Sequence, residues 1–219
     1  MSGAGGAATD LNGRGIETDA VERYLTDLAS AAPAPGGGSA AALAAALGAA
    51  LVAMTCRVTA KHAGGAPSVV RLGELAEEAD SVRRRLTALA NDDARVYSGV
   101  IAARRLPVPE RQRAVQGALE RATEVPERLA AESRNVLALC ERIAPCARNS
   151  TLSDLGVAAT LAQGALRAGA LTARTNLDGI ADGGFTGETT RRLDALVAEG
   201  MMLAERIQAA LVARGATAS

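Results

Sequence analysis

Two successive aspartates are the first residues in this chain whose type and setting suggest chemistry. Asp92 and Asp93 lie in a stretch with helical periodicity, although aspartate suits a helix interior poorly because its short side chain competes for backbone hydrogen bonds. Consecutive helical residues point in different directions, so one of the two can face inward, where burial raises a carboxyl pKa and creates a candidate acid or base. The alternative is a solvated turn that pairs with Arg95.

Asp154 is a second candidate carboxylate. It follows Ser153, and a capping serine with an acid in the first turn is also ordinary chemistry for the start of a helix, so a purely structural role is the alternative. Gly156 comes two residues later, where glycine costs about 1 kcal/mol relative to alanine in a helix interior. That cost predicts that something approaches Gly156 closely.

A glycine-rich loop opens directly into an alanine-rich helix. Residues 33–39 read PAPGGGS, so Gly36, Gly37, Gly38 and Ser39 precede or begin that helix. A helix N-terminus presents free amides that bind anions, and glycines allow a ligand to approach the backbone. The loop lacks the Gly-Lys-Ser/Thr ending of a Walker motif. Whether the glycines serve a ligand or only tight packing stays open from the spacing alone.

Few groups are suited to acid–base work near neutral pH. Lys61 is the only lysine among 24 basic residues, and it precedes His62, the only histidine. A mechanism that needs an amine or an imidazole must therefore use this pair. The alternative is electrostatic, because cations complement the partial negative charge at the end of a helix.

The cysteines and the first residues bear on the compartment. Cys56, Cys140 and Cys146 lack the spacing of a metal site, and such thiols usually behave as small buried hydrophobes in a reducing cytosol. Residues 1–16 have no apolar stretch of the signal-peptide type. We therefore expect a cytoplasmic protein without a metal, and a flexible tail over residues 1–16.

Composition favours an all-helical protein. The formal net charge is zero, which argues against a nucleic-acid partner. The chain contains one Phe, two Tyr and no Trp, so stacking platforms for single-stranded nucleic acid are also unexpected.

Residues 40–56 carry no charge, but they are at the short limit of a membrane span. We interpret them as a buried core helix rather than a membrane segment.

Helical periodicity recurs along the rest of the chain without strand-like alternation. Residues 17–214 are therefore interpreted as a single all-α domain. The expected helices are Thr18 to Ser30, a helix from Ser39, 68–105, 110–122, 125–143, Ser153 to Asn176, and Thr186 to about Gly215, with Thr18, Ser153 and Thr186 as caps.

Five segments, taken together and in order, resemble the cyclodeaminase/cyclohydrolase family of folate one-carbon enzymes. That family includes the C-terminal half of formiminotransferase-cyclodeaminase and stand-alone bacterial methenyltetrahydrofolate cyclohydrolases. The similarity extends from about Val21 to Phe185. Its segments are the loop at 33–39 with the alanine-rich helix, Asp93-Ala94 through Tyr97 to Leu106-Pro107, ATEVP at 122–126, SDLGVA at 153–158, and Asn176-Leu177.

The resemblance implies an antiparallel bundle of long helices that works as a homodimer, with a folate-sized cleft and no metal or nucleotide cofactor. It implies that Asp154 is the catalytic carboxylate and Asp93 a second acid. Substrate-binding roles are expected for Gly36, Gly37, Gly38, Ser39, Lys61 and Asn176.

The expected activity is that of a methenyltetrahydrofolate cyclohydrolase. The alternatives are a formiminotetrahydrofolate cyclodeaminase, a relative that performs another cyclisation or deamination, and a catalytically silent scaffold. The cyclohydrolase is preferred because no formiminotransferase domain is fused to the chain. Asn91 and Thr172 depart from the family pattern, which has Asp and Asn there, so these departures put the substrate in doubt.

Overall fold

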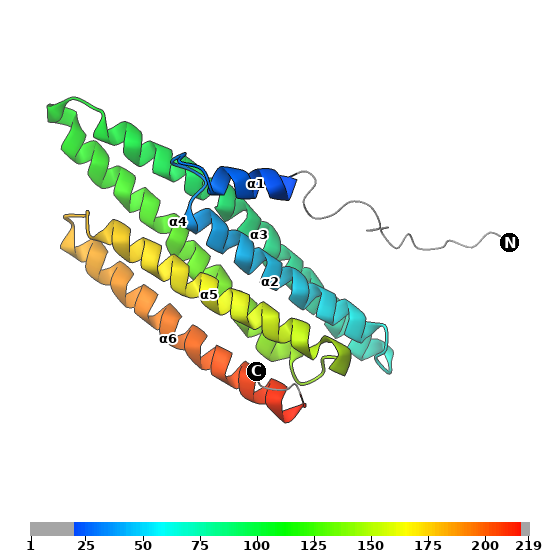
Figure 1. Ribbon diagram of the computed structural model, residues 1–219. Coiled ribbons are helices and arrows are strands. Elements are labelled where there is room, and N and C mark those ends of the chain that lie inside the picture. The colour runs from blue at the N-terminus through cyan, green and yellow to red at the C-terminus, as the bar shows by residue number, and fades with distance from the viewer. Residues whose placement is uncertain (1–19, 216–219) are drawn as a thin grey trace.

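The computed structural model describes residues 20–215 and is helical, without strands, over that range. Figure 1 shows long helices that run back and forth along one axis. In chain order the elements are α1 (Ala20–Leu28), α2 (Gly37–Ala60), α3 (Ala66–Arg104), α4 (Val108–Ile143), the 3-10 turn η1 (Asn149–Thr151), α5 (Leu152–Leu177) and α6 (Gly183–Ala213).

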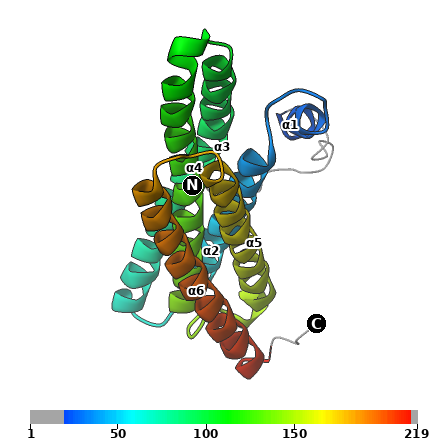
Figure 2. The same cartoon turned by 90° about the vertical axis from the view of Figure 1, so that its left-hand side faces the viewer.

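Four of these helices form an antiparallel bundle. α2 packs against α3 and α5, α3 packs against α4, and α4 packs against α5. The turns between α2 and α3 and between α3 and α4 are short, so these neighbours run in opposite directions. α6 lies outside the bundle against α4 and α5, and α1 stands apart from it (Figure 2). The all-α bundle of long helices expected from the sequence is confirmed.

Small residues bring the helices into close contact. A Cβ atom on Gly48 would lie 2.9 Å from the carbonyl oxygen of Ala158, so α2 and α5 touch at backbone level. The inner side of α3 is apolar and buried, and it consists of Leu72, Leu75, Ala79, Val82, Leu86 and Leu89. Leucines therefore fill the core while glycine and alanine set the helix spacing.

α2 is long and apolar enough to cross a membrane by length and composition, yet 61% of its most apolar 18-residue window is buried inside the protein. That burial supports the interpretation of α2 as a core helix. Its remaining side is open to the surface and continues onto α5. We call this surface the α2/α5 face. Its members are Leu43, Leu47, Leu51, Met54 and Val58 of α2 with Val157, Leu161, Ala168 and Leu171 of α5.

α4 corrects the prediction of two separate helices at 110–122 and 125–143. It is continuous from Val108 to Ile143, with Pro126 inside it. Proline lacks an amide proton, so Pro126 leaves the carbonyl of Ala122, four residues earlier, without its helical partner. The Asn176 side chain of α5 donates a hydrogen bond to that oxygen at 2.9 Å instead. A tertiary contact thus replaces the hydrogen bond whose loss predicted a break.

Two predicted helix caps were wrong. Ser153 lies inside α5, which follows the turn η1, and Thr151 occupies the capping position without a side-chain hydrogen bond. At the start of α6 the cap is Asp182 rather than Thr186, because the Asp182 carboxylate accepts hydrogen bonds from the amides of Gly184 and Phe185. The predicted cap Thr18 and the tail over residues 1–16 lie outside the described residues.

The close approach expected at Gly156 is also wrong for the described residues. A Cβ there would meet only the Leu211 side chain, at an ordinary 3.5 Å. The tight glycine on the same helix is Gly169, where a Cβ would lie 2.8 Å from the carbonyl oxygen of Pro126. Packing against a backbone, which the local sequence does not reveal, decides which glycine is required.

Candidate functional site

The structure brings Asp93 and the glycine loop together. The Ser39 amide, in the first turn of α2, donates a hydrogen bond to the Asp93 carboxylate at 3.1 Å across 54 residues of sequence. Asp93 therefore supplies a negative charge at the positive end of α2. The anion site predicted at this helix N-terminus is in part filled by the chain's own carboxylate.

Gly38 is the glycine that this contact requires. A Cβ on Gly38 would lie 2.2 Å from the Asp93 Oδ1 atom, so any other residue would displace the carboxylate. Gly36 and Gly37 differ, because a Cβ at either would meet no atom of the described chain within 4 Å. Gly36 also has an extended backbone (φ −127°) that any residue can adopt. Packing explains Gly38 and leaves Gly36 and Gly37 unexplained.

Each interpretation of the two successive aspartates applies to one of them: one is paired on the surface and the other faces inward. Asp92 forms an ion pair with Arg95 at 2.7 Å on the surface. Asp93 faces inward and is partly buried, and desolvation by burial raises the pKa of its carboxyl, while the hydrogen bond from the Ser39 amide acts in the opposite direction. The expectation of an inward aspartate with a raised pKa is therefore confirmed for Asp93. Such a carboxyl holds a proton more readily than an exposed aspartate does.

Tyr24 is a part of this region that sequence reasoning missed. Its hydroxyl donates a hydrogen bond to the buried Ser39 hydroxyl at 3.1 Å, which ties α1 to the start of α2. Nothing in the spacing of Tyr24 to Ser39 signals this contact. The only available clue was that the chain contains just two tyrosines.

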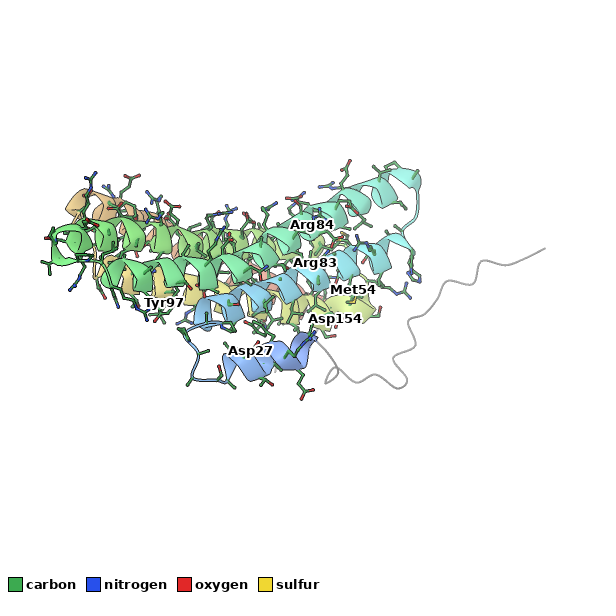
Figure 3. The ribbon with its side chains drawn as sticks, turned by 90° about the horizontal axis from the view of Figure 1, so that it is seen from above. Asp27, Met54, Arg83, Arg84, Tyr97 and Asp154 are labelled. Carbon is green, nitrogen blue, oxygen red and sulfur yellow. The ribbon has the colours of Figure 1, made fainter. Side chains whose placement is uncertain are left out.

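Asp154 lies in the first turn of α5 and is half-buried. Figure 3 shows Asp154 and Met54 of α2 at the same level along the bundle. The neighbouring hollow between α5 and α6 is lined by Ser153 and Val157 but not by Asp154. Asp154 therefore borders the α2/α5 face rather than the hollow beside α6.

Asp93 and Asp154 are well separated within one chain. α2 and α5 run in opposite directions, because Gly48 meets Ala158 while the Arg148 amide just before α5 binds the Thr59 hydroxyl near the end of α2. At 1.5 Å per helical residue, the level of Asp154 is about 20 Å along the bundle from that of Gly38. Figure 3 agrees, since Tyr97, one turn beyond Asp93, lies far from Asp154.

The remaining predicted site residues lie elsewhere. Lys61 caps the C-terminal end of α2 and lines a hollow of about 530 Å³ with Met54, Arg57 and Arg83, between α2 and α3. Asn176, at the other end of α5, is engaged with the Ala122 carbonyl. Of the expected residues, the structure therefore joins only Asp93, Gly38 and Ser39 directly.

A match to a family model shows that the protein belongs to a known family. The model described as formiminotransferase-cyclodeaminase matches residues 20–195, which include α1 to α5 and the start of α6. The chain is a member of the formiminotransferase-cyclodeaminase family. The family resemblance expected from the five sequence segments is thereby confirmed.

Two curated relatives agree with this family, and one solved structure shares the fold. A methenyltetrahydrofolate cyclohydrolase of Methylorubrum extorquens is 36% identical over 195 residues, which cover 86% of this chain and 94% of the relative. The formimidoyltransferase-cyclodeaminase of Rattus norvegicus is 31% identical over 199 residues, which cover 87% of this chain but 36% of the relative. A formiminotetrahydrofolate cyclodeaminase from Thermotoga maritima shares the fold, with a TM-score of 0.83 at 22% identity over 91% and 99% of the two chains.

The described residues of this family member contain no group of three His, Cys, Asp or Glu side chains that could hold a metal ion. Burial raises the pKa of the Cys56 thiol to about 11 and that of Cys140 to about 12. Both thiols therefore stay protonated and unreactive at neutral pH. Cys146 is the exposed member of the three. Neither Cys56 nor Cys140 is therefore a candidate for proton transfer.

Proposed function

We propose that the chain is a methenyltetrahydrofolate cyclohydrolase, which converts 5,10-methenyltetrahydrofolate to 10-formyltetrahydrofolate. The observation that carries this proposal is the similarity to the Methylorubrum extorquens cyclohydrolase, which extends over nearly the whole of both chains. The rat relative, by contrast, is matched over about a third of its length. Formiminotetrahydrofolate cyclodeaminase is the second candidate, favoured by the shared fold with the Thermotoga maritima protein.

The reaction calls for a carboxylate. Water adds to the cationic carbon that bridges two nitrogens, the water loses a proton, and a tetrahedral carbon forms. The bond from that carbon to one nitrogen then breaks, and this nitrogen takes up a proton. The hydroxyl on the carbon loses its proton as the carbonyl forms, so the formyl group stays on the other nitrogen and one proton is released overall. A carboxylate beside the carbon stabilises the positive charge of the substrate and accepts the proton from water.

Asp154 is the carboxylate to which we assign this role. It is half-buried beside the apolar α2/α5 face, so an ion held there is partly shielded from water and interacts more strongly with a cationic carbon than it would in bulk solvent. Asp93 is the second acid of the proposal. It lies about 20 Å along the bundle from Asp154 within one chain, so we assign it to substrate binding beside the glycine loop rather than to proton transfer at the reacting carbon.

The glycine loop is assigned to substrate binding. Gly36 and Gly37 are not required by packing against the described chain, so a ligand that lies against the backbone is a reason for having glycine there. Ser39 has its amide and hydroxyl engaged with Asp93 and Tyr24, and it therefore holds the loop in place. Lys61 is assigned as the cation that binds a carboxylate of the substrate. Asn176 is assigned an indirect role through its hydrogen bond to α4.

A homodimer is part of the proposal. The α2/α5 face is apolar along two adjacent helices, and Leu47, Val157 and Leu171 are 61%, 51% and 67% exposed. Contiguous apolar surfaces of this kind mark association sites. α1, which has no buried residue, stands off the same chain with Val21 and Leu25 half-exposed. A second copy on this face would cover these side chains and shield Asp154, which borders it.

We further propose that the enzyme works in the cytoplasm and needs no metal or nucleotide cofactor. The sequence of bond changes described above needs only water and proton transfer. Solvent supplies the water, and the carboxylate of Asp154 is assigned the proton transfer.

The proposal is tested by mixing the protein with 5,10-methenyltetrahydrofolate and following loss of the methenyl absorbance. We expect a rate above the uncatalysed one that falls by about 100-fold or more in Asp154→Asn. Asp178→Asn, an exposed aspartate at the end of the same helix, serves as the matched control and should keep full activity.

Two results would change the assignment. Ammonia release from 5-formiminotetrahydrofolate, with no faster loss of the methenyl compound, would favour the cyclodeaminase. Equal activities of Asp154→Asn and the native protein would remove Asp154 from the mechanism.

A further inference from the structure

A hollow at the end of the bundle that carries the α2–α3 turn concentrates positive charge. Its volume is about 640 Å³, and it lies between this turn and the C-terminal end of α4. Its floor is formed by Leu72 and Leu75, which are both buried. No acidic side chain of the described residues belongs to its lining. The basic side chains of its wall are His62, Arg71, Arg142 and Arg148, and Cys146 also lines it.

One of these cations has a structural explanation. Arg142 lies in the last turn of α4, where a cation complements the helix dipole. Its guanidinium also donates a hydrogen bond to Glu78 at 2.6 Å. The fold therefore accounts for Arg142 without a ligand.

Arg71 and Arg148 lack such an explanation. Arg71 is in the second turn of α3, close to the end of the helix that carries partial positive charge, and a cation is disfavoured there. The first turn of α3 contains no acidic residue to compensate. Neither arginine forms a salt bridge or a side-chain hydrogen bond within residues 20–215. Arg148 is bonded there through its backbone, whose amide donates to the Thr59 hydroxyl and whose carbonyl accepts from Thr151. Two guanidinium groups thus face the same hollow without partners.

We propose that this hollow binds a small anion carrying at least two negative charges, of carboxylate or phosphate chemistry. The guanidinium group pairs through two parallel hydrogen bonds with either kind of anion. The hydroxyls of Thr59 and Ser68 line the same space and add neutral donors. The volume lies within the range of small-molecule sites, about 300–1,000 Å³. The site uses neither Asp93 nor Asp154, so a failure of this proposal would not contradict the proposed activity, and the reverse also holds.

Cys146 offers a local readout, because it lines the hollow and is exposed while Cys56 and Cys140 are buried. The probes are inorganic pyrophosphate and citrate, added at constant ionic strength to the full chain, with acetate as the monovalent comparison. We expect at least one probe to slow alkylation of Cys146 by the uncharged reagent iodoacetamide, in a saturable manner. Pyrophosphate and citrate distinguish a phosphate ligand from a carboxylate ligand.

Two double variants with equal charge test the assignment to this hollow. Arg71→Gln with Arg148→Gln removes the two unpartnered arginines, and binding of the probe measured by calorimetry should weaken by about tenfold or more. Arg84→Gln with Arg191→Gln removes the same charge from exposed positions outside the hollow and should leave affinity and protection unchanged. No saturable protection by either probe, or equal losses in the two double variants, would overturn the proposal.

Discussion

At the scale of single residues, the contact of Asp93 with the start of α2 is the feature with the clearest physical consequences. The carboxylate accepts the Ser39 amide, lies against the bare Cα of Gly38, and has its pKa raised by burial. It therefore combines a structural role at the helix N-terminus with an altered readiness to bind a proton. These two roles respond differently to pH, which allows them to be separated.

Asp93→Asn should reveal the raised pKa. A carboxyl whose pKa is higher in the folded than in the unfolded chain contributes stability that is present below the unfolded value, about 3.9, and is lost as the pH rises through the folded value. Asparagine cannot ionise, and its amide oxygen can still accept the Ser39 amide. The free energy of unfolding of the variant, relative to the native protein, should therefore rise between about pH 4 and pH 7.

Urea unfolding of both proteins over this pH range measures the difference. A difference that stays constant or declines with pH would show that burial does not control this carboxyl. Methenyl-hydrolysing activity should fall in the same variant, because the substitution removes a charge beside the glycine loop that is assigned to substrate binding.

How far the site could be predicted is also decided by individual residues. Asp93, the glycine loop and Asp154 could be identified from the sequence as candidate site residues, because glycine and aspartate are costly inside helices and stand out where they occur. Which aspartate faces inward was not readable, since Asp92 and Asp93 are equivalent in sequence until α3 is placed against α2. The separation of Asp154 from Asp93 follows from the antiparallel course of α2 and α5, which local patterns do not contain.

At the scale of helices, α4 shows how a tertiary contact overrules a local signal. Pro126 predicted a break, yet the helix continues because Asn176 takes the place of the missing amide proton. Gly169 permits α5 to come close enough for this exchange. The helix types were predictable from periodicity, whereas this continuity depends on a residue 54 positions away in the sequence.

Asn176→Ala should lower the free energy of unfolding by about 1–2 kcal/mol, because it leaves the buried Ala122 carbonyl without a partner. In a Pro126→Ala background, residue 126 regains an amide proton for that oxygen, so the same substitution should cost much less. The expected coupling in the double-mutant cycle is about 1 kcal/mol. Denaturant unfolding of the four proteins measures it. Additive effects of the two substitutions would show that the Asn176 side chain does not serve this carbonyl.

At the scale of the whole molecule, the distribution of apolar surface divides the protein into two sides. α6 covers α4 and α5 on one side (Figure 2), whereas the α2/α5 face has no further helix of the described chain upon it. α2 is long and apolar, so leaving one of its sides in water is unfavourable. Association through that side would remove the exposed apolar side chains of α2 from water.

Leu47→Glu tests this association. Leu47 is 61% exposed near the middle of the α2 side of the face, and a carboxylate buried between two copies would cost about 3–5 kcal/mol. We expect the native protein to sediment as a dimer and the variant as a monomer. Val108→Glu is the matched control, because Val108 is 75% exposed at the α3–α4 turn, away from the face. A native protein that is monomeric at all concentrations, or equal behaviour of the two variants, would contradict the proposed dimer.

The fit between Gly38 and Asp93 also limits how this sequence can change over generations. A methyl group at position 38 would occupy the space of the carboxylate oxygen, so a descendant that gains alanine there while keeping the acid at position 93 would lose this contact. The reverse order is open, because losing the acid first leaves the glycine harmless. Related chains should therefore include glycine without the acid, while alanine together with the acid should be rare.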